Sequence, residues 1–211
     1  MDSTSLLQYL SMVSNKNLFL NMGIHLLVFI TIAAIYLLKD MKAKKCVFNG
    51  TILVLFLSVT INAVIYGNPF HAITFGIMTV MAGIGLARGE NRIGAPQKNT
   101  RTIVAFIFVL AGLWYPEFVE AGIFGYLIMS PVGVVPCPTL ITALGMLNLY
   151  YPDVNKKQFI VTVFFGIVYG FIGTFKLGVY LDLFLIGTVV YSIYNMIRSR
   201  SVKKIHAANQ V

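Results

Sequence analysis

The sequence predicts an all-α protein that crosses a lipid bilayer about seven times. Three observations support this prediction: 58% of the 211 residues are hydrophobic and only 11% are charged, apolar runs of membrane-spanning length recur along the chain, and basic residues cluster between alternate runs. An ordinary soluble domain is about 45–50% apolar and about 25% charged. A soluble fold of this length could not bury so much apolar surface, so hydrocarbon is the expected solvent.

Apolar runs that approach the about 20 residues needed for one helical crossing occur seven times. In chain order they cover residues 18–38, 46–66, 70–87, 102–115, 123–151, 159–175 and 177–197. Residues 18–197 are therefore expected to form a single transmembrane domain. It follows a short polar N-terminal segment, residues 1–17, which lacks the pattern of a cleaved signal peptide, and precedes a basic cytoplasmic tail, residues 198–211.

The long fifth run, residues 123–151, decides the expected topology because its prolines allow either one broken crossing or two short ones. With one crossing, all of the sixteen Lys and Arg residues except Lys16 and Lys176 fall on the same side of the membrane. With two crossings the bias almost disappears. Since basic residues concentrate on the cytoplasmic side, we expect seven crossings, the N-terminus outside and the C-terminus inside.

The break in the fifth helix is expected at Pro136-Cys137-Pro138. Proline lacks an amide donor and clashes with the preceding turn, so two prolines flanking one residue disrupt a helix. Pro138 at the first helical position would make Cys137 the N-cap. The thiol and the freed carbonyls near Val134 and Val135 would then suit a cation, including a transition metal bound by Cys137. The alternative is a simple kink with Cys137 as a small buried apolar residue.

Two hydroxyl residues, Thr139 and Thr142, follow the break. Threonines in membrane helices usually donate to carbonyls of their own helix. The functional alternative is that they line a pathway.

Ionisable side chains are costly inside membrane spans and therefore indicate function. Under the expected topology, the following lie in the outer half or at the outer surface: His25, His71, Glu117, Glu120, Lys176 and Asp182. If His25 and Asp182 face the bundle interior, they would outline an outer polar vestibule above Cys137, and the two glutamates with imidazoles would suit a divalent cation. The alternatives are a solvated loop for both glutamates, an interfacial position for His71, and pairing of Lys176 with Asp182 or water.

The stretch Gly133-Val134-Val135-Pro136-Cys137-Pro138-Thr139, continued by Ile141, Thr142, Gly145 and Leu147, resembles an uncharacterised family of small bacterial integral membrane proteins, a domain of unknown function. It is similar to that family's Phe-Gly-Val-x-Pro-Cys-Pro-Thr motif, with Val132 in place of the Phe. Weaker similarities at Tyr115-Pro116, Asp182 and Gly187 extend the resemblance over residues 103–187. The resemblance implies a multi-helix, multi-pass protein of a bacterial cytoplasmic (inner) membrane and implies no activity.

These observations favour a small transporter or channel, for a cation or transition metal, whose pathway runs from the outer vestibule to the broken helix. The first alternative is a non-transporting membrane subunit or scaffold, and the second is an intramembrane thiol enzyme that uses Cys137 with His25. Expected partners are the lipid bilayer, a small ion, and a homo-oligomer or another membrane protein. The basic charge is assigned to membrane orientation rather than to nucleic acid. No nucleotide, hydrolase or metalloprotease motif occurs, so we expect no enzyme, and no cofactor is indicated.

Overall fold

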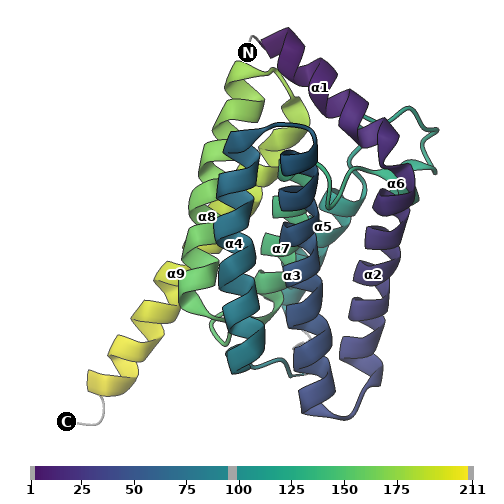
Figure 1. Cartoon of the computed structure of the whole chain (residues 1–211). Coiled ribbons are helices and arrows are strands. Elements are labelled where there is room, and N and C mark those ends of the chain that lie inside the picture. Colours follow the sequence, from purple (N-terminus) through teal and green to yellow (C-terminus); the bar gives the residue numbers. More distant parts are fainter. Residues whose placement is uncertain (1–2, 95–98, 209–211) are drawn as a thin grey trace.

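The computed structural model describes residues 3–94 and 99–208, with side chains through Ser199, and the regular secondary structure of this part of the chain consists of helices alone (Figure 1). The expected all-α fold is confirmed. Within the described residues five helices are long and apolar enough to cross a membrane. They are α2 (Leu18–Leu37), α3 (Met41–Ile65), α4 (Pro69–Arg88), α8 (Lys156–Phe171) with its extension η1 (Ile172–Lys176), and α9 (Leu183–Ala208), which follows η2 (Tyr180–Asp182).

Two of the seven expected spans have a different form. The fourth is the apolar helix α5 (Thr100–Leu113), whose 14 residues are short for a crossing. The fifth consists of one turn, α6 (Tyr126–Met129), a non-helical segment over residues 130–135, and the 15-residue helix α7 (Pro136–Tyr150).

Helix α7 begins earlier than the sequence indicated, which corrects the expected position of the break. Pro136, rather than Pro138, is the first residue of the helix, and the N-cap is Val135, not Cys137. Proline is well tolerated in a first turn because the amides there have no helical acceptor. The prolines therefore start the helix, and the interruption lies just before them.

Asparagine and aspartate side chains set several helix starts. Asp40 accepts hydrogen bonds from the amides of Lys42 and Ala43 at the start of α3, and Asn68 accepts one from His71 at the start of α4. Asn99 and Asn155 cap α5 and α8 in the same way. Such caps satisfy amides that the helix itself leaves unpaired.

Helix α7 forms the centre of the bundle, since every residue in it except Leu149 is buried. Its closest neighbour is α5, and the two helices approach each other at Gly112 of α5 and Gly145 of α7. A Cβ atom on Gly112 would lie 2.2 Å from Thr142 Oγ1, and one on Gly145 would lie 2.8 Å from the amide nitrogen of Val109. Small residues permit this contact between backbones, as is common in membrane helix pairs.

The remaining helix, α1 (Ser3–Lys16), lies across one end of the bundle (Figure 1). Asn15 Nδ2 donates to the Phe118 carbonyl at 3.0 Å, and Asn17 Nδ2 lies 3.3 Å from the Tyr66 hydroxyl. The segment expected to be only polar is therefore an ordered helix that contacts two loops. We call this the α1 end of the bundle.

Buried asparagines connect the loops at the opposite end. Asn91 Nδ2 donates to Asn49 Oδ1 at 2.5 Å, and Asn91 Oδ1 accepts from the Asn155 amide at 2.5 Å. The Arg92 amide also donates to the Asp153 carbonyl at 2.9 Å. Helix α9 continues from this end through Ala208, so most of the segment expected as a basic tail is helical.

Candidate functional site

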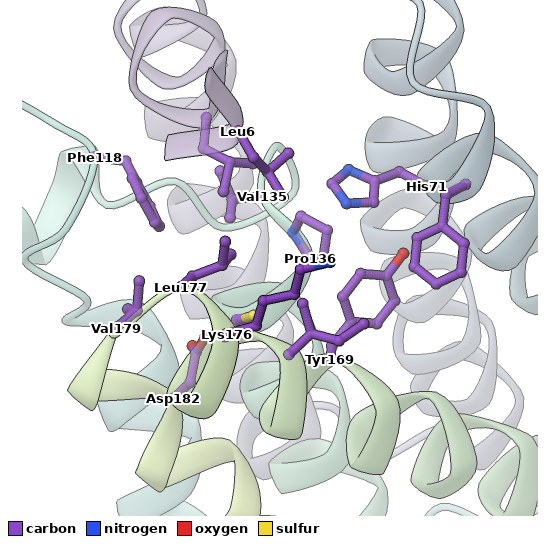
Figure 2. Close-up of a pocket in the computed structure, with 15 residues that line it drawn as sticks. Leu6, His71, Phe118, Val135, Pro136, Tyr169, Lys176, Leu177, Val179 and Asp182 are labelled. Carbon is purple, nitrogen blue, oxygen red and sulfur yellow. The ribbon is translucent and has the colours of Figure 1, made fainter. Parts of the chain in front are cut away.

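A chamber of about 260 Å³ lies at the α1 end, between α1, the start of α4, the start of α7, and the turn from η1 to η2 (Figure 2). Its lining is almost entirely apolar, with a few residues able to carry chemistry. The lining residues are Leu6, Leu10, Phe70, His71, Phe118, Val135, Pro136, Cys137, Tyr169, Ile172, Gly173, Lys176, Leu177, Val179 and Asp182.

The carboxyl group of Asp182 is the polar centre of the chamber and is almost completely buried, with 2% of the residue exposed. Its Oδ1 accepts a hydrogen bond of 2.6 Å from the Tyr115 hydroxyl. The Cys137 thiol donates a second hydrogen bond to the same carboxyl. Both donors are formally neutral, and within the described residues Asp182 forms no ion pair, so the expected pairing with Lys176 is not formed.

The carboxyl group of Asp182 lies directly against Gly173. Helix α8 ends in the π-helical turn η1, a form that often occurs at functional sites. The Val179 amide then donates to the Gly173 carbonyl at 3.0 Å, which turns the chain back. A Cβ atom on Gly173 would lie 1.6 Å from Asp182 Oδ2, so only glycine leaves room for the carboxyl group here.

Aromatic rings form two walls of the chamber. On one side, the Tyr169 ring lies 5.5 Å from Phe70 and 5.4 Å from His71 between centroids, and its hydroxyl is 2.7 Å from Thr74 Oγ1. On the other side, Phe118 stacks on Tyr115 at 6.4 Å. Figure 2 shows His71 and Phe118 on opposite sides of the chamber, with Asp182 below them. The walls are thus suited to an apolar or cationic group.

Four of the residues expected to form the site do line this chamber: Pro136, Cys137, His71 and Asp182. Thr139 does not, because its hydroxyl accepts from the Gly133 amide at 2.8 Å and donates to the Val135 carbonyl at 2.6 Å. Pro138 is buried in α7, and its carbonyl accepts from Thr142. The two bonds of Thr139 hold the non-helical segment against the start of α7, whereas the bond from Thr142 to Pro138 lies within the helix.

His25 is placed outside the chamber, which corrects the expectation of a shared vestibule. It is 1% exposed, with Nδ1 2.7 Å from the Asn21 carbonyl oxygen and Nε2 3.0 Å from that of Leu113. Ser130 Oγ lies 3.3 Å from Nε2. The imidazole therefore links α2 to the end of α5, and the imidazole and thiol of the proposed enzyme are not brought together in the chamber.

Glu117 and Glu120 lie on the loop between α5 and α6 and do not line the chamber either. Glu120 is exposed, and its amide donates to Asn15 Oδ1 at 3.2 Å. Glu117 is partly buried, and this burial raises the pKa of its carboxyl group. Among the described residues there is no group of three or more His, Cys, Asp or Glu side chains that could hold a metal ion. The acidic side chain that interacts with the Cys137 thiol is Asp182.

Two important residues of the site did not emerge from the search for ionisable groups. One is Tyr115, and the other is Gly173, which stands among apolar residues and gives no signal in the sequence. The only sequence signal for Tyr115 was its place, with Asp182, in the family resemblance. The structure brings these two residues together.

The fold and the chamber define a class of all-helical proteins with five helices of membrane-spanning character and an internal site built on a buried carboxyl group. The chain belongs to the family of unknown function DUF6064, whose model matches residues 8–207. This match extends beyond both ends of the region over which the resemblance was expected. No curated protein and no solved structure matches the chain.

Proposed function

We propose that this protein is a small integral membrane transporter that binds a cation at Asp182. The observation that carries the proposal is a buried carboxyl group in the lining of a chamber, with no basic side chain paired to it among the residues that the structure describes. A buried carboxylate is costly unless a cation or several strong donors compensate its charge. A tyrosine hydroxyl and a thiol compensate only in part, so a cationic ligand or a proton completes the site.

The membrane placement that we propose has seven crossings. Helices α2, α3, α4, α8 and α9 supply five, α5 a sixth, and α6 with the non-helical segment and α7 the seventh. This places the connections before α3, between α4 and α5, and before α8 at the end opposite α1, together with the C-terminal part of α9. These connections and the helix ends that adjoin them carry most of the basic residues, so that end is proposed to face the cytoplasm of a bacterial inner membrane.

Access from the other side would pass along α7. At its C-terminal end a second, more polar hollow of about 250 Å³ is lined by residues that include Arg101, Asn148 and Tyr151. The chamber contacts the opposite end of the same helix, at Pro136 and Cys137. Because α7 is buried between the two hollows, passage requires this helix to move, and the non-helical residues 130–135 before it provide a hinge.

The close packing of α7 favours a second candidate, a non-transporting membrane subunit in which the same polar contacts only stabilise the bundle. Flux measurements separate the two functions. The wild-type chain, Asp182→Asn and Glu120→Gln are reconstituted into liposomes and supplied in turn with protons, sodium, potassium and small organic ammonium ions. Glu120→Gln is the matched control because Glu120 is an exposed acid outside the chamber.

The transporter proposal expects flux of at least one of these cations in the wild type and the control, and its loss in Asp182→Asn. A chain that moves none of them would support the subunit instead, and flux that persists unchanged in Asp182→Asn would reject Asp182 as the cation site.

A further inference from the structure

Resting on the proposed function, we infer that the chamber binds an organic cation: a protonated amine with an apolar body, its ammonium group at Asp182 and its body against the aromatic walls. This assigns a substrate class to the site. Four features of the chamber support it: the shortage of ligand atoms for an inorganic ion, the aromatic rings, the weak thiol donor, and the position of Lys176.

The chamber offers too few ligand atoms for a bare metal ion. Calcium and magnesium take about six to eight oxygen ligands, and transition metals prefer several nitrogen or sulfur ligands. Among the described lining residues Asp182 is the only one with a carboxylate, and the hydroxyl of Tyr169 is already within 2.7 Å of Thr74 Oγ1. The described residues also contain no metal-binding group of three acidic, histidine or cysteine side chains. A cation that keeps its own apolar groups needs fewer ligands.

The rings of the lining suit such a cation. Phe70 and Tyr169 form one wall and Phe118 contributes to the other, so an ammonium group that enters between them passes aromatic faces on both sides. Aromatic rings attract alkylammonium groups through their negative faces, and this attraction is stronger where water is excluded. Leu6, Leu10 and Ile172 provide apolar contacts for the rest of the molecule.

The carboxyl group can accept an ammonium donor with little rearrangement. Tyr115 already holds Oδ1 at 2.6 Å, and the remaining donor is the Cys137 thiol. A thiol is a weak hydrogen-bond donor, whereas a protonated amine supplies a charged one. The ammonium group therefore replaces the thiol contact, while Tyr115 keeps the carboxyl group in place. No covalent bond forms or breaks.

Lys176 limits the affinity of the site. It is exposed, lines the chamber, and its backbone carbonyl accepts from Ser3 Oγ of α1 at 3.1 Å. Its ammonium group repels an entering cation, with partial screening by solvent. Removing this charge should strengthen binding of a cation, whereas it would weaken binding of an anion. Lys176→Gln thus distinguishes the two classes of ligand.

The test is equilibrium dialysis of three small molecules of similar size against the full chain in detergent: 2-phenylethylammonium, the neutral 2-phenylethanol and the anionic 3-phenylpropionate. Protein-free micelles give the background for each. We expect saturable binding of the ammonium compound alone. Asp182→Asn should weaken it roughly tenfold to a hundredfold, the usual effect of losing a charged hydrogen bond, and Glu120→Gln should leave it unchanged.

Two further variants keep the test informative if Asp182→Asn fails to fold. Phe70→Leu should weaken the ammonium compound, and Lys176→Gln should strengthen it. Equal binding by Asp182→Asn, or preferential binding of 3-phenylpropionate that Lys176→Gln abolishes, would overturn the inference. Asp182-dependent flux of protons or alkali cations without any binding of the ammonium compound would reject the substrate class and leave the proposed function standing. Binding without any flux would do the reverse.

Discussion

The Tyr115 hydroxyl lies 2.6 Å from Asp182 Oδ1, a buried hydrogen bond between residues 67 positions apart in the chain. Tyr115 follows α5, and Asp182 ends η2 just before α9. The bond therefore links the end of α5 to the start of α9 beside the chamber. It also orients the carboxyl group on which the proposed function depends.

Replacing Tyr115 by Phe should destabilise the protein by about 1–3 kcal/mol, because the variant leaves a buried carboxyl oxygen without its donor. Chemical unfolding in detergent measures the change. Tyr180→Phe is the matched control, since Tyr180 is 78% exposed and should change stability by less than about 0.5 kcal/mol. Equal stability of the two variants would mean that the hydrogen bond does not constrain Asp182.

A methyl group at position 173 should disable the site. Gly173→Ala would place a Cβ atom 1.6 Å from Asp182 Oδ2, so the carboxyl group must move away from Tyr115 and Cys137. We expect loss of cation flux and binding, measured as for Asp182→Asn. Gly50→Ala provides the control, because no atom lies within 4 Å of a Cβ atom there. Normal flux through a folded Gly173→Ala protein would show that the fit between these two residues is not required.

The two cysteines should react from opposite sides of the membrane. Cys137 lines the chamber near the α1 end, whereas Cys46 is exposed near the start of α3 at the other end. In sealed vesicles of known orientation, a membrane-impermeant thiol reagent should label Cys137 slowly from the outside in a Cys46→Ser protein. It should label Cys46 only from the cytoplasmic side in a Cys137→Ser protein.

An organic cation should slow the labelling of Cys137 and leave Cys46 unaffected. Labelling of both cysteines from one side would contradict the proposed topology. If a bound cation does not slow the labelling of Cys137, the ligand binds elsewhere.

His25 should act in stability rather than in binding. Its two ring nitrogens lie 2.7 and 3.0 Å from carbonyl oxygens of Asn21 and Leu113, so His25→Leu removes a polar link between α2 and α5. We expect a loss of about 1–3 kcal/mol in unfolding measurements, with the affinity for 2-phenylethylammonium retained in the folded protein. A stable His25→Leu variant that no longer binds the cation would return His25 to the site.

The sequence predicted how far along the bundle the site residues lie better than it predicted the directions in which their side chains point. Hydropathy and charge place a residue along a helix, so Asp182 and His71 were expected in the outer half with Cys137 below them, and all three line one chamber. The same information does not give the direction in which a side chain points. His25 shares this depth but faces the end of α5, and Glu117 and Glu120 remain on their loop.

Two local features of the site could not be predicted from the sequence. Pro136 and Pro138 both disfavour a continuous helix, but either could begin the next one, and packing against α5 accompanies a start at Pro136. The importance of Gly173 depends on the return of the chain through η1 and η2, which brings Asp182 against it. Nothing in the apolar sequence around Gly173 indicates such a contact.

The most direct test of a cation site at Asp182 is the transient current recorded when cations are applied to proteoliposomes adsorbed on a solid-supported membrane. With 2-phenylethylammonium, we expect a saturable current for the wild type and for Glu120→Gln, and no current for Asp182→Asn. A folded Asp182→Asn protein that gives the wild-type current would contradict the account.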